Sequence, residues 1–269
     1  MAKGQPNFSK MFKERIRIIY LHRHTLWNMV LSQLRAKYSG SILGITWAAI
    51  NPLLIMLAIT FVFTIIFKTG IRNFPLFVLS GILPWMFFSN ALSEVTMSFL
   101  NQQNILRQFN LPREIIPLTS ILSNFLSFLI GWFIIYPLFL FFNPKIITLL
   151  PILIVVFLLN LFFVFGLGLI LSIANVFIRD IAQLLNVLLM LWFWLTPVFY
   201  SVDMVPAKFR WICNLNPMTP YIVYYREVVF TGSIPSLPVF IAAFLWAVLS
   251  LILGLLVFPR YEYKVLKQI

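Results

Sequence analysis

One charged pair could carry chemistry in the most apolar part of this sequence. Arg179 and Asp180 are adjacent in a stretch from Ile146 to Val202 that is otherwise uncharged. Ionisable groups inside a membrane often relay protons. A relay needs further titratable groups, and no third one lies within ten residues of the pair. We therefore interpret the pair as a turn at the membrane surface, with a proton relay as the alternative.

No other group of residues has the spacing of a catalytic or metal site. Cys213 is the single cysteine, His22 and His24 have no third ligand nearby, and the carboxylates do not cluster. The phosphate-binding pattern G-x-x-x-x-G-K-[ST] is absent. We expect no catalytic residue, no metal and no bound cofactor on this chain. If ATP supplies the energy, the ATP and its magnesium belong to another subunit.

The composition is that of an integral membrane protein. Of the 269 residues, 61% are hydrophobic and 10% are charged, whereas soluble domains have roughly 45–50% and about 25%. The net charge of +13 is spread among apolar runs without a soluble recognition domain, which disfavours nucleic acid as a partner. The basic stretch from Lys3 to Arg17 has no apolar core of a signal peptide.

Apolar runs long enough to cross a membrane predict the topology. A crossing helix needs about 20 apolar residues, and continuous runs favour helices over barrel strands. We expect an all-α integral membrane fold with six transmembrane helices, at about 42–67, 74–100, 115–142, 146–178, 181–202 and 237–258.

The charged pair decides that there are six crossings. An unbroken helix from Ile146 to Tyr200 would be about 80 Å long, far more than a membrane core, and Arg or Asp at its centre would cost about 2.5–3.5 kcal/mol each. With a turn there, both termini lie on one side, with fourteen lysines and arginines against six on the other. The positive-inside rule makes that side cytoplasmic.

Three segments do not cross. Residues 8–35 form an amphipathic helix, interpreted either as a lipid anchor or as a docking surface; its apolar positions are Phe8, Phe12, Ile16, Ile19, Trp27, Val30 and Leu34. Residues 101–114 allow a short surface helix, read either as a connector or as a partner contact. Residues 203–236 are apolar but interrupted by prolines, which predicts a re-entrant gate segment or an aromatic belt. Glu94 is expected to pair with a loop arginine.

Six strings, taken together, resemble one family. They are KYSGSILGITWAAINPLL (37–54), GILPWMFFSNAL (81–92), LPREIIP (111–117), NVFIRD (175–180), WLTPVFY (194–200) and NPMTPYI (216–222). In this order they resemble the membrane subunit of type-2 ABC transporters that export lipid-linked polysaccharides, most closely the O-antigen exporters. Ile178 departs from the aromatic residue that the family more often carries.

The resemblance implies a homodimer around a central channel, with two copies of a cytoplasmic ABC ATPase. It implies an interface helix in residues 1–40, a permease domain in 41–260, a coupling segment at 101–113, gate helices at 201–226 and a cytoplasmic tail at 261–269. ATPase-coupling residues are then Gln102, Ile105, Leu106, Arg107, Phe109, Arg113, Arg179 and Asp180. The location would be a bacterial inner membrane, with both termini in the cytoplasm.

Aromatic side chains suit a polysaccharide conduit because sugar rings slide along them without directional hydrogen bonds. The candidate lining residues are Trp85, Phe87, Phe88, Trp192, Trp194 and Tyr200, with helix packing or lipid contact as the alternative. Arg35 and Lys37 are candidates for meeting the diphosphate of the lipid headgroup. Teichoic acid or capsule export by the same mechanism, an ion-coupled flippase and an enzyme that modifies lipid-linked sugars stay open as alternatives.

Overall fold

The computed structural model describes residues 17–109 and 111–268, and this part of the chain is helical without strands. The expected apolar positions Phe8, Phe12 and Ile16 lie outside it, as does residue 110 of the expected coupling segment. The all-α fold is confirmed. The helices are α2 (Arg23–Tyr38), α3 (Trp47–Thr60) with a π-helical end (Phe61–Ile66), α4 (Phe74–Asn101), α5 (Gln103–Gln108), α6 (Ile115–Phe142), α7 (Ile146–Phe177), α8 (Ile181–Leu195), α9 (Arg210–Leu215), α10 (Thr219–Arg226) and α11 (Leu237–Gln268).

Five helical segments in the described residues are long and apolar enough to cross a membrane, at 44–66, 74–101, 115–142, 146–177 and 237–265. The sixth expected span is shorter than predicted, because α8 ends at Leu195 and not near Val202. Pro197 disfavours helical backbone at the residue before it, and Thr196 is extended (φ −95°, ψ 134°). Fifteen residues give α8 a length of about 22 Å, less than the roughly 30 Å of a membrane core.

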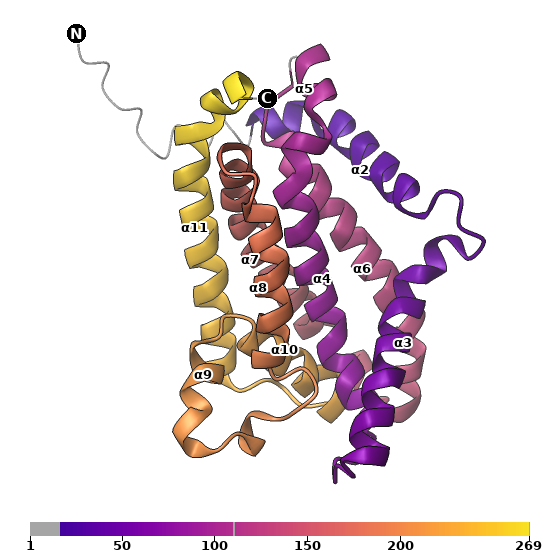
Figure 1. The fold of residues 1–269 in the computed structure, drawn as a ribbon. Coiled ribbons are helices and arrows are strands. Elements are labelled where there is room, and N and C mark those ends of the chain that lie inside the picture. Colours follow the sequence, from indigo (N-terminus) through magenta and orange to yellow (C-terminus); the bar gives the residue numbers. More distant parts are fainter. Residues whose placement is uncertain (1–16, 110, 269) are drawn as a thin grey trace.

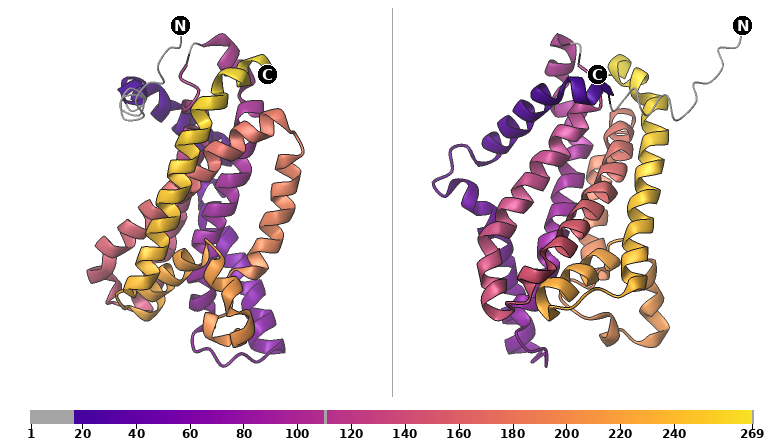
Figure 2. Two further views of the ribbon diagram at one scale, coloured as in Figure 1. Left: turned by 90° about the vertical axis from the view of Figure 1, so that its left-hand side faces the viewer. Right: turned by 180° about the vertical axis from the view of Figure 1, so that it is seen from behind.

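The long helices α4, α6, α7 and α11 run side by side, as the views in Figures 1 and 2 show. Helix α3 lies at one edge of this bundle and α8 at its margin. Helix α5 projects from one end, where the C-terminus also lies, whereas α9 and α10 gather at the opposite end (Figure 1). The main apolar core contains residues of α4, α6, α7 and α10.

Small residues allow α7 and α11 to pack with their backbones in contact. A Cβ atom added at Gly166 would lie 2.2 Å from the carbonyl oxygen of Ser250, and one at Gly254 would lie 2.5 Å from the carbonyl oxygen of Gly166. The Ser250 hydroxyl donates a 2.7 Å hydrogen bond to the carbonyl oxygen of Phe163. Close approach through glycine and serine is a common way to pair helices in lipid.

The first described helix packs on the bundle with part of its apolar face. Helix α2 slants across the end of the bundle that carries α5 (Figure 1), and it buries Val30 and Leu34, whereas Trp27 is exposed. The apolar positions of this segment therefore divide between protein packing and a surface that is free to contact lipid.

Helix α11 extends beyond the apolar run that predicts it. The run ends at Phe258, but the helix continues through Pro259 to Gln268. Phe258 and Val265 are buried in a second apolar cluster together with Leu106 of α5. Most of the expected cytoplasmic tail is thus the end of a helix packed against the coupling segment, and its last residue, Ile269, lies outside the described residues.

Candidate functional site

The turn predicted at Arg179 and Asp180 is confirmed. Helix α7 ends at Phe177 and α8 begins at Ile181, while both charged residues are exposed. The side-chain oxygen of Asn175 accepts a 3.1 Å hydrogen bond from the backbone N–H of Ala182 and so satisfies one of the free donors at the start of α8. Ile178 is exposed as well, so its departure from an aromatic residue disturbs no packing.

The segment expected to couple the chain to a partner forms helix α5. Leu106 is buried and anchors the helix to the bundle, Ile105 is half-buried, and Phe109 is 58% exposed. The guanidinium of Arg113 lies over the ring of Tyr263, 4.8 Å from its centroid, so that side chain also contacts the end of α11. Gln102 is half-buried and Arg107 is exposed. The structure brings these residues together at one end, beside Phe177 and the turn; their coupling role stays a prediction.

Glu94 pairs with a lysine of the N-terminal helix and not with the loop arginine that we expected. The ammonium group of Lys37 lies 2.6 Å from Oε1 of Glu94 and 2.8 Å from the side-chain oxygen of Asn124. The Asn124 amide donates to Oε2 of Glu94 at 2.7 Å. Three elements, α2, α4 and α6, are thereby tied together. The sequence did not predict this ion pair, because Lys37 and Glu94 are 57 positions apart.

The apolar segment between α8 and α11, for which the composition predicts re-entry, packs against the bundle through α10. Helix α10 buries most of its side chains, including Tyr221, Ile222 and Tyr225, and the Tyr221 hydroxyl donates to the carbonyl oxygen of Ala243 on α11 at 2.8 Å. Trp211 of α9 is exposed. The tyrosines of α10 are therefore core residues of this end, whereas Trp211 fits an aromatic belt. The role of the segment as a gate stays a prediction.

Asn216 connects the re-entrant segment to the end of α8. Its side-chain oxygen accepts hydrogen bonds from the Trp192 indole N–H at 2.8 Å and from the backbone N–H of Met218 at 2.9 Å. Its amide donates to the Thr196 hydroxyl at 2.9 Å. One side chain thus holds the last turn of α8 against the start of α10, in the strings WLTPVFY and NPMTPYI.

Arg226 is a functional candidate that sequence reasoning missed, because we counted it only among the outer basic residues. Its guanidinium is buried and donates to the carbonyl oxygens of Pro197 and Val198, both at 2.8 Å, and of Tyr200 at 3.3 Å. It also lies 3.7 Å from the centroid of the Phe77 ring. The signal that could have found it is an adjacent pair of charges, Arg226 and Glu227, between the apolar runs TPYIVYY and VVF.

The position of Arg226 depends on a glycine in α4. A Cβ atom at Gly81 would lie 2.8 Å from the carbonyl oxygen of Val198 and 3.2 Å from the Arg226 guanidinium. The planar guanidinium has five donors and can serve several acceptors at once. Arg226 thus replaces the hydrogen bonds that the backbone loses where Pro197 ends α8, and it fixes the following loop against α4.

Comparisons with known proteins identify the family. The sequence profile described as "ABC-2 type transporter" matches residues 24–230. The chain belongs to the ABC-2 type transporter membrane family. It is 29% and 30% identical to two proteins of Klebsiella pneumoniae named O-antigen export system permease protein RfbA, over 86% of this chain and 89% of each relative. A protein of the same name from Myxococcus xanthus is 30% identical over 82% of this chain and 86% of its own length.

The aromatic residues predicted to line a channel in this permease fall into two groups. Trp85, Phe87 and Phe88 are buried within the single chain, and the Trp85 and Phe88 rings pack edge to face on Trp192, with centroids 6.5 and 5.1 Å away. Their burial gives these three a packing role in the single chain, and Phe87 also lines a cavity between α2, α3, α4 and α6. A channel role for them stays a prediction.

The other aromatic candidates of the permease are accessible to different degrees. Trp194 is 59% exposed, whereas Trp192 and Tyr200 are half-buried, and the Tyr200 hydroxyl donates to the carbonyl oxygen of Trp194 at 3.3 Å. Of the two cations expected to meet a headgroup, Arg35 is exposed, but Lys37 is engaged by Glu94 and Asn124. The described residues contain no group of three or more metal-ligating side chains.

Proposed function

We propose that this permease forms the channel of an ATP-driven exporter that moves lipid-linked polysaccharide, with O-antigen as the first candidate, out of the bacterial cytoplasm. The observation that carries the proposal is the similarity to three O-antigen export permeases over more than four fifths of the chain. Export of teichoic acid or capsular polysaccharide is the alternative with the same mechanism. The chain would act without an active site of its own.

The energy source in this proposal is a separate cytoplasmic ABC ATPase, which binds the ATP and magnesium. The chain has no P-loop. Ion-coupled transporters use free carboxylates in their membrane segments. Within the described residues, two carboxylates lie inside the long helices: Glu262, at the end of α11, and Glu94, in α4. Lys37 and Asn124 donate hydrogen bonds to the two oxygens of Glu94. This pairing disfavours an ion-coupled flippase.

Helix α5 is the proposed contact for the ATPase. It projects from the bundle at the end that carries the α7–α8 turn (Figure 1), and it combines a buried anchor, Leu106, with an exposed apolar side chain, Phe109. A rigid anchor under an exposed hydrophobic side chain can transmit a push from a partner to α4, which ends at Asn101. Arg179 and Asp180 would form a second contact at the turn.

The proposed assembly is a homodimer that encloses the channel with α8. This helix buries only Leu185 and Leu189 in the single chain, whereas Met190 is 61% exposed. One apolar face of this short helix packs on its own bundle, and its other apolar face is exposed. Such an exposed face fits a two-fold contact with a second copy of the chain. Trp194, on the same open helix, would then be the aromatic residue best placed to meet a sugar polymer.

The proposed orientation is based on the distribution of charge. In the described residues, Arg107, Arg113 and Arg179 lie at the end with α5, whereas Lys145 and Lys208 lie at the other end. Together with the count over the whole sequence and the positive-inside rule, these charges support a proposed orientation in which α5 and both termini lie on the cytoplasmic side of the inner membrane. In this orientation α10 and Arg226 lie toward the outer side.

Two measurements test the proposal. Mutation of the P-loop lysine of the partner ATPase should abolish polysaccharide export; export that continues on a proton gradient alone would refute the proposal. Charge reversal by Arg107→Glu should weaken copurification of the ATPase, whereas the matched variant Lys145→Glu at the outer end should retain it. Unchanged ATPase retention and activity in Arg107→Glu would remove α5 as the contact.

A further inference from the structure

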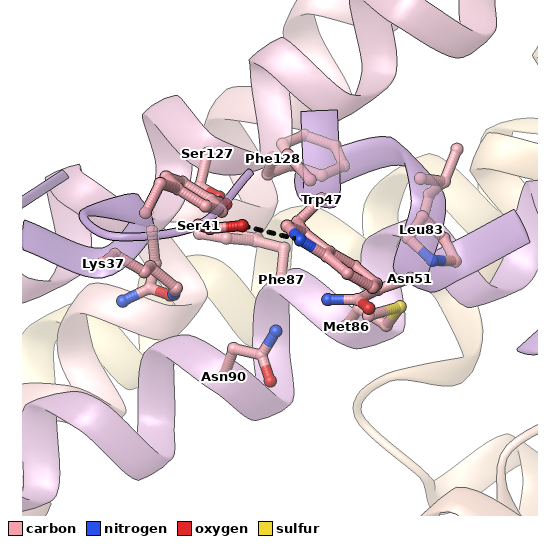
Figure 3. Close-up of a pocket in the computed structure, with 14 residues that line it drawn as sticks. Lys37, Ser41, Trp47, Asn51, Leu83, Met86, Phe87, Asn90, Ser127 and Phe128 are labelled. Carbon is pink, nitrogen blue, oxygen red and sulfur yellow. Dashed lines mark hydrogen bonds between the residues drawn. The ribbon is translucent and has the colours of Figure 1, made fainter. Parts of the chain in front are cut away.

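A cavity with polar and apolar walls lies where the N-terminal helix meets the first membrane helix. It has a volume of about 330 Å³ and is lined by the end of α2, the start of α3, and one face each of α4 and α6 (Figure 3). This volume is at the lower end of the roughly 300–1,000 Å³ of small-molecule sites, so it suits a single ring-sized ligand. The α4 residues that line it, from Leu83 to Asn90, are 11–18 positions before the end of α4 at Asn101, or about 16–27 Å along the helix. The cavity therefore lies within the depth of the bundle, below the proposed cytoplasmic surface.

One set of polar residues holds the walls of this cavity together. Lys37, Glu94 and Asn124 bind one another across α2, α4 and α6 at 2.6–2.8 Å. The Tyr38 hydroxyl is hydrogen-bonded to the Ser127 hydroxyl. Because these groups already have partners, they shape the cavity and offer little free hydrogen-bonding capacity to a ligand.

A second set of polar residues is free. The Asn51 and Asn90 side chains line the cavity from α3 and α4 (Figure 3). Both residues are exposed, and neither amide has a hydrogen-bond partner within the residues that the structure describes. A side-chain amide presents two donors and an acceptor in one plane. Such groups match the adjacent hydroxyls of a sugar, each of which donates and accepts.

An oriented aromatic ring faces the same space. The Trp47 indole N–H donates a 2.9 Å hydrogen bond to the Ser41 hydroxyl (Figure 3), which fixes the indole, and Phe87 and Phe128 add apolar wall. Aromatic faces carry partial negative charge and attract the weakly positive C–H faces of pyranose rings. Fixed aromatic faces beside free amides are the combination that binds carbohydrate.

The charge of the cavity favours a sugar over a phosphate as its ligand. Lys37 is the one charged residue that lines it in the described part of the chain, and Glu94 lies 2.6 Å from its ammonium group. The pair is neutral overall, and a diphosphate would have to approach a carboxylate. An uncharged, polyhydroxylated ligand meets no such repulsion.

We propose that this cavity binds one sugar unit of the lipid-linked polysaccharide as it approaches the channel, by stacking on Trp47 and hydrogen bonding to Asn51 and Asn90. The inference rests on the proposed function. It changes the expectation for Lys37, which now supports the walls of a sugar site and does not meet the diphosphate directly. Arg35, exposed at the end of the same helix, remains available to the phosphate.

A cysteine placed in the cavity tests the site. Cys213 is the single cysteine; it is buried, and burial raises the pKa of its thiol, so Cys213→Ser provides a background without other thiols. Met86→Cys places a thiol at the cavity wall without removing a proposed recognition group. Met204→Cys, in an exposed residue at the other end, is the matched control. Maleimide labelling is measured on the complex with its ATPase in lipid nanodiscs.

Three probes distinguish the sources of protection. They are the polyprenyl-diphosphate-linked glycan extracted from cells that make the protein, the same lipid diphosphate stripped of sugar, and the free sugars from hydrolysis of that glycan. At about ten times its Kd, the glycan should slow labelling of Met86→Cys about elevenfold by mass action. Free sugars should protect at higher concentration, the stripped lipid should not protect, and Met204→Cys should label at an unchanged rate.

Substitution of the free amides tests recognition directly. In the Met86→Cys background, Asn51→Ala and Asn90→Ala should each raise the glycan concentration for half-protection about fivefold, the value of one hydrogen bond. Asn214→Ala, which removes an exposed amide of α9 outside the cavity, should leave it unchanged. Equal protection by the stripped lipid, or none by the glycan, would overturn the sugar site. ATP-dependent export by the unmutated complex is scored separately: export without protection refutes the cavity alone, and absence of export refutes the proposed function.

Discussion

Helices α7 and α11 and helix α8 represent two ways of holding a helix in this bundle. Gly166 and Gly254 let α7 and α11 approach until backbone atoms touch, and Ser250 adds a hydrogen bond between the helices. Helix α8 has no such contact. It buries Leu185 and Leu189, and most of its other apolar side chains are exposed in the single chain.

Polar contacts near its two ends compensate for the weak packing of α8. Asn175 satisfies the backbone at the start of the helix, while Asn216 and Arg226 hold its end and the loop that follows. Between them, Ser93 of α4 donates a 3.2 Å hydrogen bond to Asn186. The difference teaches that the α7–α11 pair is built for a fixed position, whereas α8 is positioned by its ends and leaves one apolar face exposed, which fits the proposed contact with a second copy.

The largest expected loss of stability comes from a substitution in the close contact between α7 and α11. Gly166→Ala would place a methyl group 2.2 Å from the Ser250 carbonyl oxygen, and no side chain can rotate away to relieve that clash. Overpacking typically costs 1–3 kcal/mol, and we expect about 3 kcal/mol or more here because backbone must separate from backbone. The measurement is the midpoint of thermal unfolding in detergent.

Gly70→Ala is the control for this substitution. A Cβ atom at Gly70 would meet nothing within 4 Å, so the unfolding midpoint should change little. A Gly166→Ala protein as stable as the Gly70→Ala protein would mean that the close approach of α7 and α11 contributes nothing to stability.

A smaller effect, confined to the end of α8, is expected from Arg226→Met. The substitution removes the donors from the carbonyl oxygens of Pro197 and Val198 while keeping much of the side-chain volume. A buried group left without its partner costs about 1–3 kcal/mol, so we expect a loss of about 2 kcal/mol in unfolding free energy. Arg226→Lys should recover only part of it, because one ammonium group cannot span the acceptors as a guanidinium does.

Arg210→Met is the matched control, since Arg210 also donates to backbone carbonyl oxygens, those of Val205 and Asp203, but is exposed. Its stability should change by less than about 0.5 kcal/mol. Equal losses of unfolding free energy in Arg226→Met and Arg210→Met would show that burial does not increase the contribution of the Arg226 hydrogen bonds to stability.

The sequence predicts those parts of the fold that depend on local pattern. The long apolar runs become helices, the charged pair at Arg179 becomes a turn because burial of two charges is costly, and prolines around Asn216 break the re-entrant segment. The end of α8 shows the limit of run length as a guide: the sequence stays apolar through Tyr200, but the helix ends at Leu195, and Thr196, which precedes Pro197, is extended. A proline alone does not predict such an end, because α4 and α7 continue through Pro84 and Pro151.

Contacts between distant positions could not be predicted in the same way. Lys37 and Glu94 meet only because α2 folds back over α4 and α6, and Arg226 finds its acceptors 26 to 29 positions earlier in the chain. The aromatic candidates illustrate a different limit. Trp85 and Trp194 both occupy apolar helices, so composition alone did not distinguish the buried ring from the exposed one.

The smallest effect on stability, and the sharpest on assembly, is expected on the open face of α8. In the Cys213→Ser background, Leu188→Cys replaces an exposed side chain and should change unfolding free energy by less than about 0.5 kcal/mol. Residues close to a two-fold axis meet their own copies, and a disulfide forms only when Cα atoms approach within about 7 Å. Oxidation should therefore link two copies through a cysteine at Leu188, or one helical turn away at Leu184 or Leu191.

Leu249→Cys and Leu253→Cys on α11 supply the contrast, because both residues are exposed to a similar degree but belong to the helix already paired with α7. They should remain monomeric on a non-reducing gel. If α11 cross-links and all three positions of α8 do not, the open face of α8 contacts lipid, and the second copy must be placed against the other side of the bundle. The weak packing of α8 would then have to be explained by movement of this helix within one chain, held by Asn216 and Arg226 at one end and by Asn175 at the other.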